Sequence, residues 1–313
     1  MMKHLRQLIL PLILGPIAAG CTHPSGNTTV TRLDRTLASG TLPTDTRTLD
    51  ATRTLFMVSG YGEPTDSLVA RYASMPSIAI HRHSVDSVFT DMASEEAALG
   101  KVFSRLGDML DGFTHPAVYA VISPFNQSVI MADSVLFIGL NHYLGTDYAP
   151  YGYFPDFIRA RKVRARLPLD VAEAVVRTRR PFVPQSAYPT LLDRLIYEGA
   201  VTQAVMNATG ATEADVLGYD REQSRWLRDN ETAMWNTLLH RNLIYSTDDA
   251  VIRSATSLSP ATTVISPEAP GGAGRYIGSH IVGAWLAGHP DATVDSILSH
   301  PIPSPQFLRD SGY

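Results

Sequence analysis

Residues 191–208 read LLDRLIYEGAVTQAVMNA and decide the fold, because they predict a long and strongly apolar helix. Within it, Glu198 interrupts the apolar side chains. A buried glutamate needs a charged partner, since an unpaired buried charge costs on the order of several kcal/mol. Arg194, one turn earlier, and Arg275 are the candidate partners. We therefore favour a structural ion pair over a catalytic role for Glu198.

Helical patterns lie on both sides of this stretch. Thr212 and Asp215 resemble a capping box. Short β-branched stretches at 117–122 and 128–140, separated by residues 124–127, predict a hairpin or a small group of strands. The fold class is therefore α+β, a mostly helical single domain with a small β-hairpin or sheet. The further predicted helices cover residues 64–74, 84–110, 170–178, 212–218, 220–241, 275–288 and 293–299.

The first residues have the pattern of a lipoprotein signal peptide. Lys3 and Arg6 precede an apolar run at 8–17, which is too short to span a bilayer, and small residues then lead to Cys21. This resembles the bacterial lipobox, in which the cysteine is lipidated. An ordinary signal peptide with an incidental cysteine is the alternative. Lipidation is favoured because Cys21 is the only cysteine in the chain, so no internal disulfide competes for it.

The chain is thus expected to have three parts, namely a signal peptide at 1–20, a lipid-anchored polar tether at 21–45 and a globular domain at 46–313. The tether is rich in Thr, Ser, Gly and Pro, although residues 30–37 could form a short edge strand. No later stretch has the length and apolarity of a transmembrane helix. The lipid on Cys21 would then be the only membrane anchor, and the outer membrane facing the periplasm is the default location.

The charge of the chain gives no reason to expect a nucleic-acid partner. The net charge is −4, and it becomes −6 when Lys3 and Arg6 leave with residues 1–20. A mildly acidic protein lacks the basic surface that binds phosphate backbones. The expected partners are therefore the membrane, through the lipid, and a protein of the cell envelope.

Catalytic motifs are missing from the sequence. No two histidines have the spacing of a zinc peptidase helix, and no Gly-x-Ser-x-Gly motif is present. The glycine-rich residues 271–274 indicate a flexible start of a helix rather than a phosphate site. Asp170 and Glu173, one turn apart, are expected on a solvated helix face. We therefore expect no metal and no cofactor.

Several motifs together resemble the GldB family of gliding-motility lipoproteins, over about residues 28–300. Tyr276, Ala200 and Ser279-His280 depart from the family, which usually has Trp, Lys and Trp-Gln there. The motifs that carry the resemblance are Met131-Ala132-Asp133-Ser134-Val135, Gly139 to Gly145, Tyr151 to Phe154, Ile196-Tyr197-Glu198-Gly199, Gly218-Tyr219, Glu222-Gln223, Trp226, Asn230-Glu231, Met234-Trp235, Tyr245-Ser246-Thr247-Asp248 and Gly274-Arg275.

The resemblance implies an envelope lipoprotein that acts beside secretion and gliding machinery, as in some Bacteroidota, without a firmly assigned activity. It also implies a distant likeness to zinc-metallopeptidase folds, whose metal-binding helix would fall near residues 170–176. That helix has no histidine here. The architecture would then be a degenerate zincin-like one that has lost the metal.

Two functions follow as hypotheses. The first is a non-catalytic scaffold that binds a partner in a groove of aromatic and hydrogen-bonding residues. The second is an envelope hydrolase in which Glu198 and Glu231 flank a substrate, which requires both carboxylates in one open cleft roughly 5–10 Å apart. The candidate groove residues are Tyr143, Tyr197, Glu198, Asn230, Glu231, Trp235 and Arg275.

Overall fold

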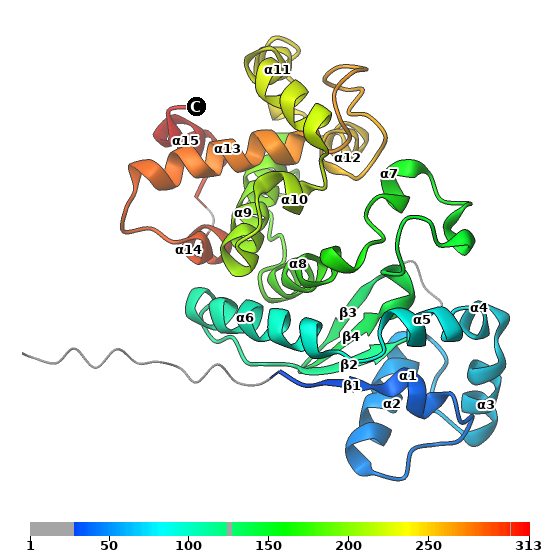
Figure 1. Cartoon of the computed structure of the whole chain (residues 1–313). Helices are drawn as coiled ribbons and strands as arrows, with labels where there is room; N and C mark the ends of the chain where they lie inside the picture. Colours follow the sequence, from blue (N-terminus) through cyan, green and yellow to red (C-terminus); the bar gives the residue numbers. More distant parts are fainter. Residues whose placement is uncertain (1–27, 124–126, 301) are drawn as a thin grey trace, which may run out of the picture.

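A small mixed sheet lies below the central helices of the domain (Figure 1). The computed structural model describes residues 28–123, 127–300 and 302–313, so Cys21 and the predicted signal peptide lie outside the described residues. The strand order is β1-β2-β4-β3, with β1, β2 and β4 parallel and β3 antiparallel to β4. The strands are β1 (Val30–Arg32), β2 (Ala117–Val121), β3 (Val129–Ala132) and β4 (Val135–Gly139).

Helices fill the chain before, between and after these strands. The helices of the N-terminal part are α1 (Leu33–Leu37), α2 (Thr46–Val58), α3 (Asp66–Ser74), α4 (Pro76–Ala79), α5 (Arg82–Val88) and α6 (Ala93–Met109). The helices of the C-terminal part are α7 (Asp156–Arg159), α8 (Leu167–Arg179), α9 (Leu191–Thr209), α10 (Glu213–Leu217), α11 (Arg221–His240), α12 (Asp249–Thr256), α13 (Ala273–Gly288), α14 (Val294–Ser299) and α15 (Ser304–Ser311). Figure 1 shows α6 and α8 above the sheet and the helices from α9 onward beyond them.

The apolar helix α9 is the centre of the C-terminal part. A capping box of Thr190 and Asp193 begins it, and Gly210, with a φ of 74°, ends it in the left-handed conformation. Helices α6, α8, α13 and α14 all pack against it. The contact with α13 is the closest, because a Cβ on Gly199 would lie 2.1 Å from the carbonyl oxygen of Gly278. Only glycines allow the two backbones to approach this far.

The predicted α+β class and the predicted helices are confirmed, including the capping box of Thr212 and Asp215 that begins α10. One boundary differs. Residues 30–37, placed in the polar tether, are folded: Val30 begins the edge strand β1, whereas residues 33–37 form α1 and not a strand. Leu33 and Leu37 are fully buried, so burial of these leucines holds this segment against the domain.

No helix among the described residues combines the length and the apolarity needed to cross a bilayer.

Candidate functional site

Helices α8, α9 and α13 bring charged side chains together beside the close contact of α9 and α13. Glu198 directly precedes Gly199, and Arg275 lies one turn before Gly278. The close approach of the two helices therefore places the Nε of Arg275 3.5 Å from the Oε2 of Glu198. This is one of the two partners that the sequence suggested for Glu198.

Arg177 on α8 makes the strongest contacts in this group. Its Nη1 and Nη2 donate to the two carboxylate oxygens of Glu198 at 3.1 and 2.5 Å. Its Nε and Nη2 also donate to Oε1 of Glu173 at 3.0 and 2.8 Å. A guanidinium that binds one carboxylate through two nitrogens forms a directional and strong ion pair. Arg177 thereby joins α8 to α9.

Three arginines surround the carboxylate of Glu173. Arg275 also donates to its Oε1 at 3.0 Å, and the Nη2 of Arg166 lies 3.8 Å from its Oε2. Burial alone would raise the pKa of Glu173, but the charges of Arg275, Arg177 and Arg166 outweigh burial and hold that pKa well below its ordinary value. Glu173 therefore stays charged at neutral pH.

Asp170 extends the group toward the sheet. The Nε of Arg166 donates to its Oδ1 at 2.8 Å, and the hydroxyl of Tyr143 donates to its Oδ2 at 3.0 Å. Burial and the negative charge of Asp170 raise the pKa of Tyr143 well above its ordinary value, so Tyr143 stays a neutral donor. We call the whole group the arginine–acid cluster. It comprises Arg166, Asp170, Glu173, Arg177, Glu198 and Arg275.

A second polar group surrounds Glu231 on α11. The hydroxyls of Tyr276 and Tyr313 donate to its two oxygens at 3.0 and 2.8 Å. The ring of Trp235 meets the ring of Tyr313 edge-on, with centroids 5.1 Å apart. We call this the Glu231 cluster; it ties the C-terminal tyrosine to α11 and α13.

His280 completes the Glu231 cluster. Its Nδ1 lies 2.7 Å from Oε1 of Glu231, and its Nε2 lies 3.3 Å from Oε2 of Glu213. Burial lowers the pKa of His280, but the hydrogen bond and charge of Glu213 and those of Glu231 raise it by more, so the net shift is upward. An imidazole with a carboxylate at each nitrogen is most stable when both nitrogens carry a proton.

This arrangement predicts that His280 stabilises the fold in acid and less at alkaline pH. Because its folded pKa is raised, its contribution is complete below the unfolded value of 6.5 and is lost as the pH rises through the folded pKa. We expect His280→Gln to lower the melting temperature at pH 6, and the difference from the wild type to shrink as the pH rises above 6.5. Differential scanning calorimetry between pH 5.5 and 9 measures both quantities.

His240 provides the matched control, because it is exposed and forms no ion pair among the described residues. The melting curve of His240→Gln should follow the wild type at every pH. A pH-independent difference between His280→Gln and the wild type would contradict the ion-pair role of His280.

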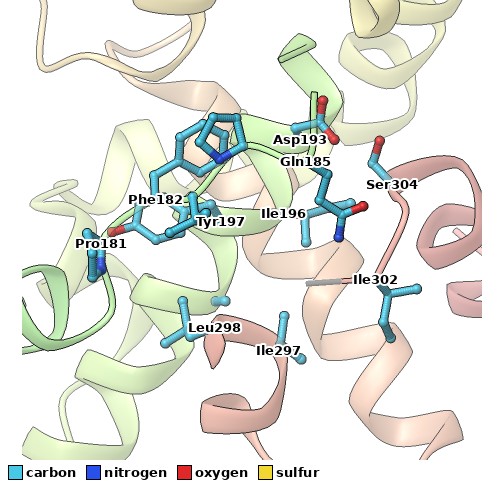
Figure 2. Close-up of a pocket in the computed structure, with 13 residues that line it drawn as sticks. Pro181, Phe182, Gln185, Asp193, Ile196, Tyr197, Ile297, Leu298, Ile302 and Ser304 are labelled. Atoms are coloured by element: carbon cyan, nitrogen blue, oxygen red, sulfur yellow. The ribbon is translucent and has the colours of Figure 1, made fainter. Parts of the chain in front are cut away.

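Tyr197 touches the arginine–acid cluster only through its ring, whose centre lies 5.8 Å from the guanidinium of Arg177, and Asn230 belongs to neither cluster. The hydroxyl of Tyr197 donates to the carbonyl of Arg180 at 3.0 Å, and its ring packs against Phe182. Figure 2 shows Tyr197 beside Phe182 in a pocket closed from below by Ile297 and Leu298 of α14. The amide of Asn230 donates to the carbonyl of Trp226 within its own helix at 2.8 Å.

The candidate residues from the sequence therefore do not line one groove. The structure joins Tyr143, Glu198 and Arg275 to the arginine–acid cluster, and Glu231 and Trp235 to the Glu231 cluster. Asp170 and Glu173 were expected on a solvated helix face; their side chains are only 21% and 16% exposed, and they pair with Arg166 and Arg275 beside an open pocket. Sequence reasoning missed Arg177, although its spacing of four residues from Glu173 is that of a helical ion pair.

Arg194 is not the partner of Glu198 either. Its guanidinium lies 3.9 Å from the centre of the Phe182 ring instead, in a cation–π contact. The pairing of Glu198 with Arg177 and Arg275 agrees with the structural role that the sequence favoured.

The geometry gives the hydrolase hypothesis no support. The side chain of Glu198 is only 9% exposed, and both of its oxygens accept from Arg177. Glu231 has a separate set of partners on α13 and at the C-terminus. In the part of the chain that the structure describes, no three His, Cys, Asp or Glu side chains are arranged to hold a metal ion.

Comparison with known proteins identifies the family. A family model described as "Gliding motility protein GldB" matches residues 21–313, which include both clusters. No curated protein and no solved structure matches the chain significantly. Because the match spans nearly the whole chain, the protein belongs to the GldB gliding-motility family.

Proposed function

We propose that this protein is a lipid-anchored, non-catalytic interaction component of gliding-motility or related machinery in the cell envelope. Membership of the GldB family supports the link to gliding motility. The signal-like residues 1–20 and the lone Cys21 support the anchor. The domain would then be held at the outer membrane, facing the periplasm, where it binds an envelope protein.

The observation that carries the non-catalytic role is the pairing of the acidic residues of the arginine–acid cluster with arginines. A general acid or base works best when its pKa lies near the operating pH. Arg275, Arg177 and Arg166 instead hold the pKa of Glu173 far below that range, and Glu198 accepts hydrogen bonds from Arg177 at both oxygens. Both carboxylates fix helices in place, and Glu173, held charged in this way, is poorly suited to exchanging protons with a substrate.

Crosslinking in intact envelopes tests the proposal. The tagged full chain and its Cys21→Ala variant are crosslinked, purified and analysed for co-purifying proteins by mass spectrometry. We expect one envelope protein in near-stoichiometric amount with the wild type, and its loss with Cys21→Ala, because the unanchored variant no longer stays at the membrane.

Thr22→Ala is the matched control, since it changes the neighbouring residue and keeps the thiol. It should retain both the membrane fraction and the partner. If neither the wild type nor the variants yield a partner, the interaction role is wrong. If Cys21→Ala remains in the membrane fraction with unchanged partners, the lipid anchor is wrong.

A further inference from the structure

Arg161 stands out because it is a largely buried cation that forms no ion pair with a carboxylate of the described residues. Among the described residues its one hydrogen bond runs from Nη1 to the carbonyl oxygen of Leu217, at 2.8 Å. The absence of a side chain on Gly218 makes room for it, since a Cβ there would lie 2.4 Å from that Nη1. Burial and the nearby positive charges of Arg166 and Arg275 lower the pKa of Arg161 to about 10, and the more distant carboxylates of Asp170 and Glu173 offset this only in part. The protein therefore holds a guanidinium in place at an energetic cost.

The charges around Arg161 do not balance. Arg161 and the arginine–acid cluster together contain four arginines and three acidic residues, so one positive charge is in excess. The three carboxylates accept hydrogen bonds from other groups, namely Glu198 from Arg177, Glu173 from Arg177 and Arg275, and Asp170 from Arg166 and Tyr143. An additional anion would compensate this excess, and Arg161 is the arginine of this group that pairs with no carboxylate among residues 28–123, 127–300 and 302–313.

Arg161 lines an open pocket between α8 and β3. The pocket has a volume of about 510 Å³, which is within the range of ligand sites. One wall is a single face of α8, formed by residues 170, 173, 174, 177 and 178, and the opposite wall is residues 127–131 at the start of β3. Figure 1 shows α8 crossing above β3. A ligand can thus reach Arg161 and the edge of the sheet together.

The wall formed by β3 is the edge of the sheet. β3 is last in the strand order, with β4 as its one neighbour. The amide of Gly139 donates to the carbonyl of Ser128, so Ser128, Ile130 and Ala132 are the residues that bond to β4 in the alternating antiparallel pattern. The amide and carbonyl groups of Val129 and Met131 then point away from β4. Such an edge can accept a further strand.

We propose that this pocket binds an extended peptide segment that bears a carboxylate, which adds to the edge of β3 and pairs with Arg161. The backbone of the peptide would bond to Val129 and Met131, and its carboxylate would supply the counter-ion that Arg161 lacks. The carboxylate can be an Asp or Glu side chain or the end of a chain. This inference rests on the proposed interaction role and names the chemistry of the partner.

Short peptides test the carboxylate. Fluorescein-labelled Thr-Val-Glu-Val-Thr and Thr-Val-Gln-Val-Thr, both amidated at the C-terminus, are titrated with the full-length protein in detergent, and fluorescence anisotropy is measured. A third peptide, Thr-Val-Gln-Val-Thr with a free C-terminal carboxylate, distinguishes the side chain from the chain end. We expect at least one carboxylate peptide to bind about tenfold or more tightly than the amidated Gln peptide. Equal affinities for all three, or no binding, would overturn the proposal.

Two variants locate the site. Arg161→Gln should reduce the affinity of the preferred peptide to that of the neutral one. Because it removes an unpaired charge, it should not lower the melting temperature. Arg159→Gln is the matched control, since Arg159 is on the same segment but pairs with Asp156 and lies outside this pocket. Unchanged affinity in Arg161→Gln would overturn the assignment of Arg161.

N-methylated peptides test the addition to the strand. The preferred peptide is methylated at alternate backbone nitrogens, in two versions that cover the two registers. One version should bind about tenfold or more weakly, because its donors toward β3 are removed. If both bind as the parent does, strand addition is wrong. If no peptide binds but envelope crosslinking still yields a partner, this inference fails and the proposed function stands.

Discussion

Gly278→Ala is expected to lower the free energy of unfolding by about 3 kcal/mol or more. The new Cβ would lie 2.0 Å from the carbonyl oxygen of Leu195, which belongs to the backbone of α9. A backbone cannot rotate away as a side chain can, so α13 must move as a whole. The movement would also draw Arg275 away from Glu198 and Glu173.

Urea unfolding, followed by tryptophan fluorescence, measures this loss. Gly288→Ala on the same helix is the control, because no atom lies within 4 Å of its new Cβ. It should be neutral or slightly stabilising, since alanine favours a helix over glycine by up to about 1 kcal/mol. If Gly278→Ala unfolded at the same urea concentration as Gly288→Ala, the close packing of α9 on α13 would be wrong.

The elements that the sequence predicted correctly are those with a local signal. The apolar run at 191–208 and the capping box at Thr212 act within a few residues, so they can be recognised without the rest of the fold. Helix α2 was not predicted, because its sequence has no such prominent pattern. Its buried face holds only Ala51, Thr52, Leu55 and Phe56. The burial of residues 30–37 depends on strand β2, far along the chain, and local composition therefore misled.

The same distinction between local signals and contacts of distant segments applies to the candidate site. Glu198 was recognisable as a charge that interrupts an apolar helix, and Arg275 as one of its partners. The hydrogen bond of Tyr313 to Glu231 joins residues 82 positions apart, and nothing in either segment indicates it. Whether carboxylates on two helices share a cleft depends on helix packing. The sequence therefore suggests the hydrolase hypothesis but does not show whether the two carboxylates share a cleft.

Arg177→Met is expected to lower the free energy of unfolding by roughly 2–3 kcal/mol at pH 7. The variant keeps most of the side chain's apolar volume but removes one of the positive charges that neutralise Glu198 and Glu173. Breaking a buried pair from one side leaves a desolvated charge behind. We expect a loss of free energy of unfolding toward the low end of the range for buried ion pairs. The side chain of Arg177 is 32% exposed, so water screens part of the interaction.

The dependence on pH and a double variant separate this effect from lost packing. The low pKa of Glu173 gives stability that is present above its unfolded value of 4.5 and is lost as the pH falls through the folded pKa. The loss of stability in Arg177→Met should therefore shrink in acid, whereas a packing defect would persist.

Adding Glu198→Gln to Arg177→Met should restore part of the stability at pH 7, because no unpaired charge then remains at position 198. Arg253→Met, which removes an exposed pair with Asp249, should change nothing measurable. A deficit that is equal at pH 7 and in acid, and additive in the double variant, would show that the arginine–acid cluster holds the helices by packing alone.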